Sequence, residues 1–105
     1  MPRIDDLEAE RLRMLEMLAE CNAIKAAIRQ TNEENPPSDA DSAAAIEARS
    51  ERNTRHRRMC GKAAQCEMRL TELRAEIAKE KARLHLAASA ARRADRERIA
   101  RELAA

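Results

Sequence analysis

Few residues of this 105-residue chain combine in a pattern that could do chemistry, and the best candidate is a histidine–cysteine pair. His56 and Cys60 are four residues apart, a spacing that places two side chains on one face of a helix. With Cys66 further along and Cys21 elsewhere, imidazole and thiolate ligands for a metal could be assembled. However, the chain contains no Cys-x-x-Cys pair and no His-Glu-x-x-His motif, and cysteines within helical patterns usually pack as small apolar residues. We therefore expect no metal site.

No other group of residues in the sequence indicates catalysis. His85 lies between two leucines, with no predicted serine or cysteine nucleophile beside it. Glu33 and Glu34 form a carboxylate pair, but they fall at a predicted loop, where nothing would remove them from water. A single glycine cannot build a phosphate-binding loop, and the absence of aromatic residues removes base-stacking platforms. We expect neither an enzyme nor a cofactor.

The most prominent charge feature is a basic segment that directly follows an acidic one. Residues 32–51 contain one basic and six acidic residues, whereas residues 52–69 contain six basic and one acidic, so their net charges are −5 and +5. Solvated helix faces commonly show such charge runs. The alternative is a surface that binds a partner by charge. The residues predicted for that role are Arg52, Arg55, Arg58 and Lys62.

The order of parts in the second half of the chain resembles a basic leucine zipper. Asn53 lies in the basic segment, and large aliphatic residues follow at seven-residue intervals. The family has small residues three and four positions after that asparagine, where this chain has His56 and Arg57. It also has an arginine eight positions after it, where this chain has Gly61. The resemblance implies a nucleic-acid-binding helical dimer that uses residues 52–62 and the Arg-rich C-terminus, and this is the alternative function.

A coiled-coil seam is predicted over residues 59–87, where apolar residues recur at alternating three- and four-residue steps, interrupted by Glu80. An isolated helix gains little stability in water, so such a seam must be buried against another helix. We therefore expect the chain to associate with itself, through this seam and a similar stripe near the N-terminus. The residues predicted for self-association are Leu7, Met14, Leu18, Ile28, Leu70, Leu73, Ile77 and Leu84.

A first helix is predicted over about residues 4–32. Asp5 followed by Glu8 is typical of a capping box, and Ile4 and Ala9 are placed to form a hydrophobic staple across it. Apolar residues on both sides of its seam make the stripe too wide for one neighbouring helix, so the pattern favours a bundle. These flanking residues are Leu15, Met17 and Ile24.

The only clear break in the helical pattern is Asn35 followed by two prolines. The prolines remove two backbone donors and disfavour the helical conformation of the asparagine before them. This predicts a loop over residues 33–38 that returns the chain antiparallel to the first helix. Ser38 with Asp41 three residues later is typical of a second capping signature.

A second helix is therefore predicted over about residues 39–103. Weak helix formers such as Asn53 and Gly61 leave two possibilities, a continuous helix, which we favour, or a break between these residues. In a broken helix Gly61 would serve as the C-cap.

Composition agrees with long helices in a single domain of residues 1–105. Ala, Glu, Lys, Leu and Arg account for 67 of the 105 residues. We expect an all-α fold, an antiparallel helical hairpin or coiled coil with a long second helix, within a dimeric helical bundle. Because all these residues are strong helix formers, this expectation needs no particular motif.

The expected function is that of a non-catalytic protein–protein interaction module, such as an adaptor, a chaperone-like protein or an inhibitor, for example a viral inhibitor of a host protein. It would act as a coiled-coil homodimer on another protein, whose identity the sequence leaves open. An odd number of cysteines favours a reducing cytoplasm. The charged N-terminus and the lack of a long apolar run predict neither a signal peptide nor a transmembrane helix, so we expect no membrane partner.

Overall fold

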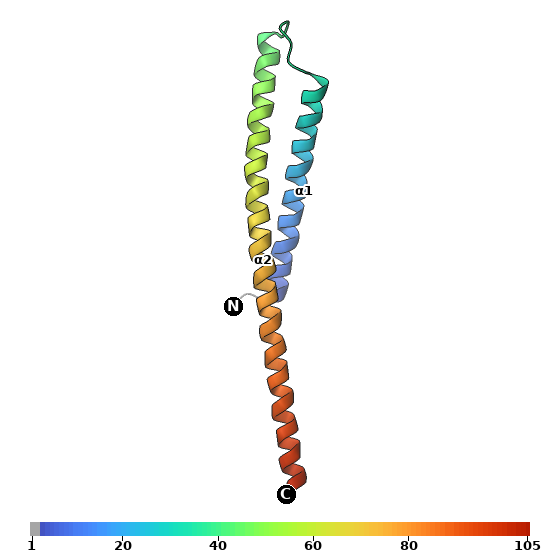
Figure 1. Ribbon diagram of the computed structural model, residues 1–105, viewed down its shortest axis with the longest axis vertical. Helices are drawn as coiled ribbons and strands as arrows, with labels where there is room; N and C mark the ends of the chain where they lie inside the picture. Colours follow the sequence, from blue (N-terminus) through green and yellow to red (C-terminus); the bar gives the residue numbers. More distant parts are fainter. Residues whose placement is uncertain (1–2) are drawn as a thin grey trace.

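Two long antiparallel helices joined by one loop make up the part of the chain that the computed structural model describes, residues 3–105 (Figure 1). Helix α1 spans Ile4–Glu34 and helix α2 spans Ala43–Ala104. The molecule measures 97 × 21 × 15 Å. Since a helix rises about 1.5 Å per residue, α2 alone covers most of that length. The predicted all-α hairpin with a long second helix is confirmed. Neither α1 nor α2 contains the long apolar stretch that crossing a membrane requires.

Helix α1 begins earlier than its predicted capping box. Arg3 is the N-cap residue, with extended backbone angles (φ −75°, ψ 154°), and among residues 3–105 no side chain caps this end. Asp5 therefore lies inside the first turn, and the predicted capping box with Glu8 is wrong. The predicted hydrophobic staple between Ile4 and Ala9 is also wrong, because its first residue must precede the N-cap and Ile4 is already helical. The Asp5 carboxylate still favours the helix, since the N-terminal end of a helix carries partial positive charge.

The loop is longer than the predicted residues 33–38. Ser38 and Asp41 close a turn, in which the Ser38 N–H donates to Asp41 Oδ2 (3.0 Å) and the Asp41 N–H donates to the Ser38 carbonyl (3.1 Å). Helix α2 begins only after Ser42, whose Oγ accepts a hydrogen bond from the N–H three residues later (3.1 Å). The predicted start at about residue 39 is therefore too early, because the first serine builds a turn and the second caps the helix.

Helix α2 runs without a break through Asn53 and Gly61. Gly61 is therefore not a C-cap, and the continuous alternative holds. A Cβ atom built on this glycine would meet no other atom within 4 Å. One glycine costs a helix only about 1 kcal/mol relative to alanine, which strong helix formers on both sides can offset.

The hydrophobic core lies at the open end of the hairpin, meaning the end away from the loop. Leu7 of α1 packs there with Leu73 and Ile77 of α2, and the partly buried Met14 packs against them. Leu73 is fully buried, with 0% of its surface exposed. The apolar stripe predicted for α2 therefore finds its partner helix within the same chain.

Toward the loop, polar contacts join the helices beside the buried Ile28. Arg52 Nε donates to Asn32 Oδ1 (2.9 Å), and Asn32 Nδ2 donates to Asn53 Oδ1 (3.3 Å). Closer to the loop, Arg49 Nη2 lies 2.9 Å from Asp41 Oδ2. A hydrogen bond from the Ser38 backbone and a second one from Arg49 lower the pKa of Asp41. Polar contacts thus add to apolar packing in joining the two helices near the loop.

Helix α2 continues well past the start of α1 (Figure 1). Glu8 and Lys81, whose side chains come within 3.8 Å, mark the last ion pair between the helices among residues 3–105. We call residues 83–104 the α2 extension. Every residue of this segment is exposed except Ser89, which is partly buried. At about 1.5 Å per residue, the extension is roughly 33 Å long.

Candidate functional site

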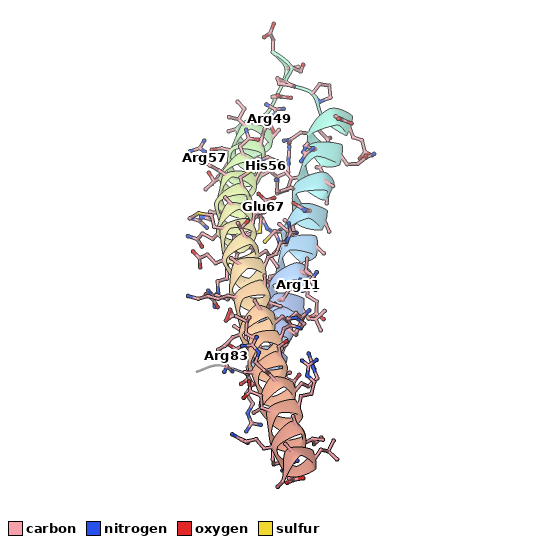
Figure 2. The ribbon with its side chains drawn as sticks, turned by 60° about the horizontal axis from the view of Figure 1, so that its bottom comes forward. Arg11, Arg49, His56, Arg57, Glu67 and Arg83 are labelled. Carbon is pink, nitrogen blue, oxygen red and sulfur yellow. The ribbon has the colours of Figure 1, made fainter. Side chains whose placement is uncertain are left out.

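The histidine–cysteine pair lies on the side of α2 that faces α1, as the position of His56 in Figure 2 shows. The Cys60 Sγ atom is 3.6 Å from His56 Nδ1, whereas His56 Nε2 is buried without a hydrogen-bond partner among the described residues. Cys21 and Cys66 are buried. Within residues 3–105, no group of three or more histidine, cysteine or acidic residues is arranged to hold a metal ion. The pair therefore packs in the seam between the two helices.

The structure separates the four basic residues predicted to bind a partner. Arg52 is half-buried in the seam, where it bonds to Asn32 of α1. Arg55, Arg58 and Lys62 are exposed, and their spacing of three and four residues places them along one side of α2. Of the four predicted residues, these three are exposed to solvent, and we call them the basic flank.

An apolar surface of α1 lies beside the basic flank. Ile24 and Ala27 of α1 line a shallow open cleft of about 260 Å³, whose other wall includes Arg55 of α2. Arg58 lines a neighbouring hollow together with Arg55. Met17, 37% exposed, lies seven residues before Ile24 and so continues the apolar surface along the same side of α1. The cleft combines an apolar floor with a cationic rim.

The cations of the basic flank are not neutralised. Among residues 3–105, no ion pair joins Arg55, Arg58 or Lys62 to a carboxylate. Arg57, also exposed, extends from α2 on the side away from α1 (Figure 2) and does not belong to this surface. Within the described part of the chain, the flank therefore presents three positive charges without an ion pair, of which Arg55 lies beside Ile24 and Ala27.

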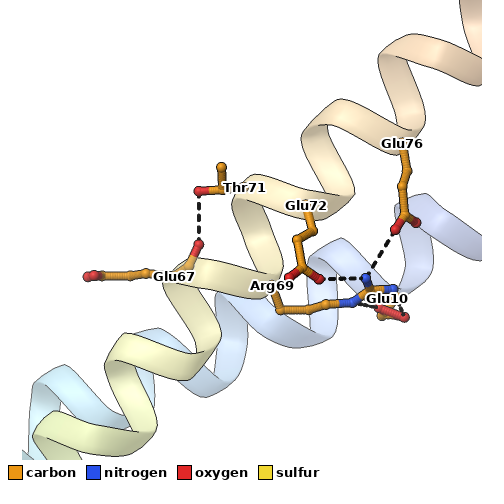
Figure 3. A network of polar contacts seen from close by, with 6 residues as sticks. All are labelled: Glu10, Glu67, Arg69, Thr71, Glu72 and Glu76. Atoms are coloured by element: carbon orange, nitrogen blue, oxygen red, sulfur yellow. Dashed lines mark hydrogen bonds and ion pairs between the residues drawn. The ribbon is translucent and has the colours of Figure 1, made fainter.

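Toward the open end, a charged network ends the basic flank. Arg69, seven residues after Lys62, contacts Glu10 of α1 and also Glu72 (3.1 Å) and Glu76 (3.2 Å) of its own helix (Figure 3). The hydrogen bond from Arg69 holds the pKa of Glu10 below its usual value, and the same contacts raise the pKa of Arg69. Three carboxylates thus neutralise this arginine, which leaves it unavailable to a partner.

The residues predicted for self-association mostly lie inside the hairpin. Leu7, Ile28, Leu73 and Ile77 are buried between α1 and α2. Three more are partly buried, and only Leu84 is exposed. The partly buried residues are Met14, Leu18 and Leu70.

Sequence reasoning missed the contribution of α1 to the candidate site. Ile24 was recognised as part of a wide apolar stripe, but its position beside Arg55 depends on how the two helices pair. One sequence signal could have indicated how the helices pair. Arg55, Lys62 and Arg69 are seven residues apart and so lie on one side of α2, and Arg69 forms an ion pair with Glu10 of α1.

Comparison of the chain with protein-family models, with curated proteins and with solved structures found no match. The residues and geometry of the hairpin are therefore the only basis for its function.

Proposed function

We propose that this chain is a non-catalytic protein–protein interaction module, a coiled-coil homodimer that binds an acidic, amphipathic segment of another protein. The observation that carries this proposal is the basic flank, in which Arg55 lines a cleft with Ile24 and Ala27, while Arg58 and Lys62 continue the exposed positive charge along the same side of α2. An apolar groove with a charged rim is a common recognition mode for an amphipathic helix. Opposite charge on the partner would raise the association rate and fix its orientation.

A protein partner fits this surface better than nucleic acid, the alternative function. Phosphate backbones need cations but no apolar floor, whereas Ile24 and Ala27 offer apolar area beside Arg55. A zipper dimer would also need Leu70 and Ile77, which lie against α1 of the same chain. These observations favour an adaptor, a chaperone-like protein or an inhibitor as the kind of module.

The proposed working environment is the reducing cytoplasm. Cys21, Cys60 and Cys66 are all unpaired thiols. Disulfides would be expected in a small domain built for an oxidising compartment.

The test is affinity purification from the native host at physiological salt, with captured proteins identified by mass spectrometry. The bait is compared with the variant Arg55→Ala, Arg58→Ala, Lys62→Ala. A matched control removes three exposed arginines outside the basic flank, Arg57→Ala, Arg74→Ala, Arg93→Ala.

One acidic protein should be enriched by the wild type and the control but lost with the basic-flank variant. Its association rate should fall as salt rises, and this dependence should be weaker in that variant. Equal capture of the partner by the wild type and by the basic-flank variant would refute the proposed surface. DNA binding at sub-micromolar affinity in ~150 mM salt, lost in the same variant, would instead favour the nucleic-acid function, because non-specific binding is typically ~10⁻⁴–10⁻⁶ M.

A further inference from the structure

Most of the exposed large apolar residues lie on two segments, the open end of α1 and the α2 extension, whereas Ile46 and Met68 lie elsewhere on α2. Leu12 is 58% and Leu15 39% exposed at the open end of α1, while Ile99 is 48% and Leu103 83% exposed in the α2 extension. Stable monomers rarely leave several large apolar side chains uncovered on neighbouring turns. Each segment therefore needs a cover that its own hairpin does not supply.

The open end of α1 carries acidic and apolar residues along one side. Asp5, Glu8, Leu12 and Leu15 are three, four and three residues apart, so they share one side of the helix. Glu8 forms an ion pair with Lys81 on one side of the seam, and Glu10 forms an ion pair with Arg69 on the other. Arg69 lies on the same side as the basic flank, so the side of Glu8 is the opposite one. We call these four residues the acidic flank.

The α2 extension carries a complementary series. Arg92, Arg96, Ile99 and Leu103 are four, three and four residues apart and also share one side of their helix. Among the described residues, ion pairs of the extension involve Arg83 and Arg98 but neither Arg92 nor Arg96. Two cations followed by two apolar residues thus match two carboxylates followed by two apolar residues, in the same order and at similar spacing.

Overall charge supports the same pairing. Residues 4–20 contain two arginines and six acidic residues, a net charge of −4, whereas residues 83–104 contain six arginines and three acidic residues, a net charge of +3. Two α2 extensions side by side would repel each other. An α2 extension beside the start of α1 would be attracted.

We propose that a second copy of this chain covers both segments, in a two-fold symmetric dimer where each α2 extension lies on the acidic flank of the partner. When the two α2 helices run antiparallel, each extension runs parallel to the partner's α1, because α1 is antiparallel to its own α2 (Figure 1). The basic series then meets the acidic series in matching order. This interface specifies the homodimer included in the proposed function and leaves the basic flank open.

The register of this dimer places the two leucines at the start of the extension near the two-fold axis. In the hairpin, Leu7 packs on Leu73 and Ile77, so Leu15 lies level with about residue 68 of α2. Setting Leu103 level with the partner's Leu15 places the two-fold axis at about residue 85, midway between these positions. Leu84 and Leu86, 46% and 69% exposed, would then lie near this axis, level with the partner's Leu86 and Leu84.

A charge-swap experiment tests the interface. One variant carries Arg92→Glu, Arg96→Glu, and a second carries Asp5→Lys, Glu8→Lys. In a homodimer of either variant, both contacts join like charges, so the dissociation constant should rise roughly tenfold or more. In an equimolar mixture, both contacts of the heterodimer join opposite charges.

Light scattering at tens of micromolar should give twice the 11.9 kDa chain mass for the wild type, monomers for each variant alone and a dimer for the mixture. The single chain carrying all four changes should form a homodimer again. Arg57→Glu, Lys79→Glu, which makes the same charge change at exposed sites outside both series, should stay dimeric.

A monomeric wild type would refute this interface together with the homodimer. A wild-type dimer whose mass none of the variants changes, or a mixture that stays monomeric, would refute this interface alone. Circular dichroism checks that each variant is helical. If a reversal unfolds the chain, Arg92→Gln, Arg96→Gln and Asp5→Asn, Glu8→Gln replace it and should weaken the dimer in the same direction.

Discussion

Arg69 of α2 holds Glu10 of α1 with two hydrogen bonds, from Nε to Oε2 at 2.7 Å and from Nη2 to Oε1 at 2.9 Å, across 59 residues of sequence (Figure 3). Such a two-pronged contact fixes geometry better than a single ion pair, since the guanidinium and carboxylate planes must match. It fastens the open end of the hairpin on one side of the core.

This contact should make the hairpin sensitive to acid. The pKa of Glu10 is lowered in the folded chain, mainly by the hydrogen bond from Arg69. Its stabilisation is therefore fully present above the ordinary glutamate pKa of ~4.3 and is lost as the pH falls through the lowered folded value. In urea melts from pH 7 to pH 2, Glu10→Gln should lose less stability on acidification than the wild type.

Asp95→Asn is the matched control for that titration. The Asp95 carboxylate is 3.6 Å from Arg98 on the exposed α2 extension, where ion pairs contribute little. It should reproduce the wild-type acid profile. Identical profiles for the wild type and Glu10→Gln would mean that the contact with Arg69 does not stabilise the folded chain.

Leu73 should be the most sensitive position of the core. Leu73→Ala should lower the free energy of unfolding by roughly 2–5 kcal/mol, and Leu73→Asp should abolish the cooperative transition, because a charge would be buried without a partner. Met68 is 66% exposed, and Met68→Asp should change stability by only about 0.5 kcal/mol. Comparable losses at both positions in thermal melts would show that the assigned buried face is wrong.

Gly61 offers a stabilising substitution. Gly61→Ala should raise the free energy of unfolding by about 1 kcal/mol, because the added Cβ meets no atom within 4 Å and alanine loses less backbone entropy in a helix. The reverse change at the exposed Ala64, Ala64→Gly, should lower it by a similar amount. A destabilised Gly61→Ala variant in thermal melts would argue that α2 bends or breaks at this residue.

Substitutions at Arg52 and at Arg55 should change the free energy of unfolding by different amounts, although the two residues are only three apart in sequence. Arg52→Ala removes the hydrogen bond to Asn32 and should cost about 0.5–1.5 kcal/mol, whereas Arg55→Ala should cost less than about 0.5 kcal/mol. A double-mutant cycle with Asn32→Ala measures the coupling directly. Zero coupling would mean that the bond contributes nothing to the pairing of the helices near the loop.

The sequence alone determined the helices and the turn between them. Helix propensity acts residue by residue, and the two prolines after Asn35 exclude a continuous helix whatever the rest of the chain does. The start of α2 was less predictable, because Ser38 and Ser42 compete for the same role. Hydrogen bonds of Ser38 with Asp41 decide that competition in favour of Ser42 as the cap.

Only the tertiary structure decided what each side of the helices meets. The spacing of Leu70, Leu73 and Ile77 shows that this stripe must be buried, but an apolar stripe does not specify whether its partner belongs to the same chain. The fold places α1 against it. In the same way, pairing with α1 turns Arg52 into a seam residue and leaves Arg55 beside an apolar cleft. The physical reason is that helix formation depends on neighbours in sequence, whereas burial and ion pairing depend on residues that only folding brings together.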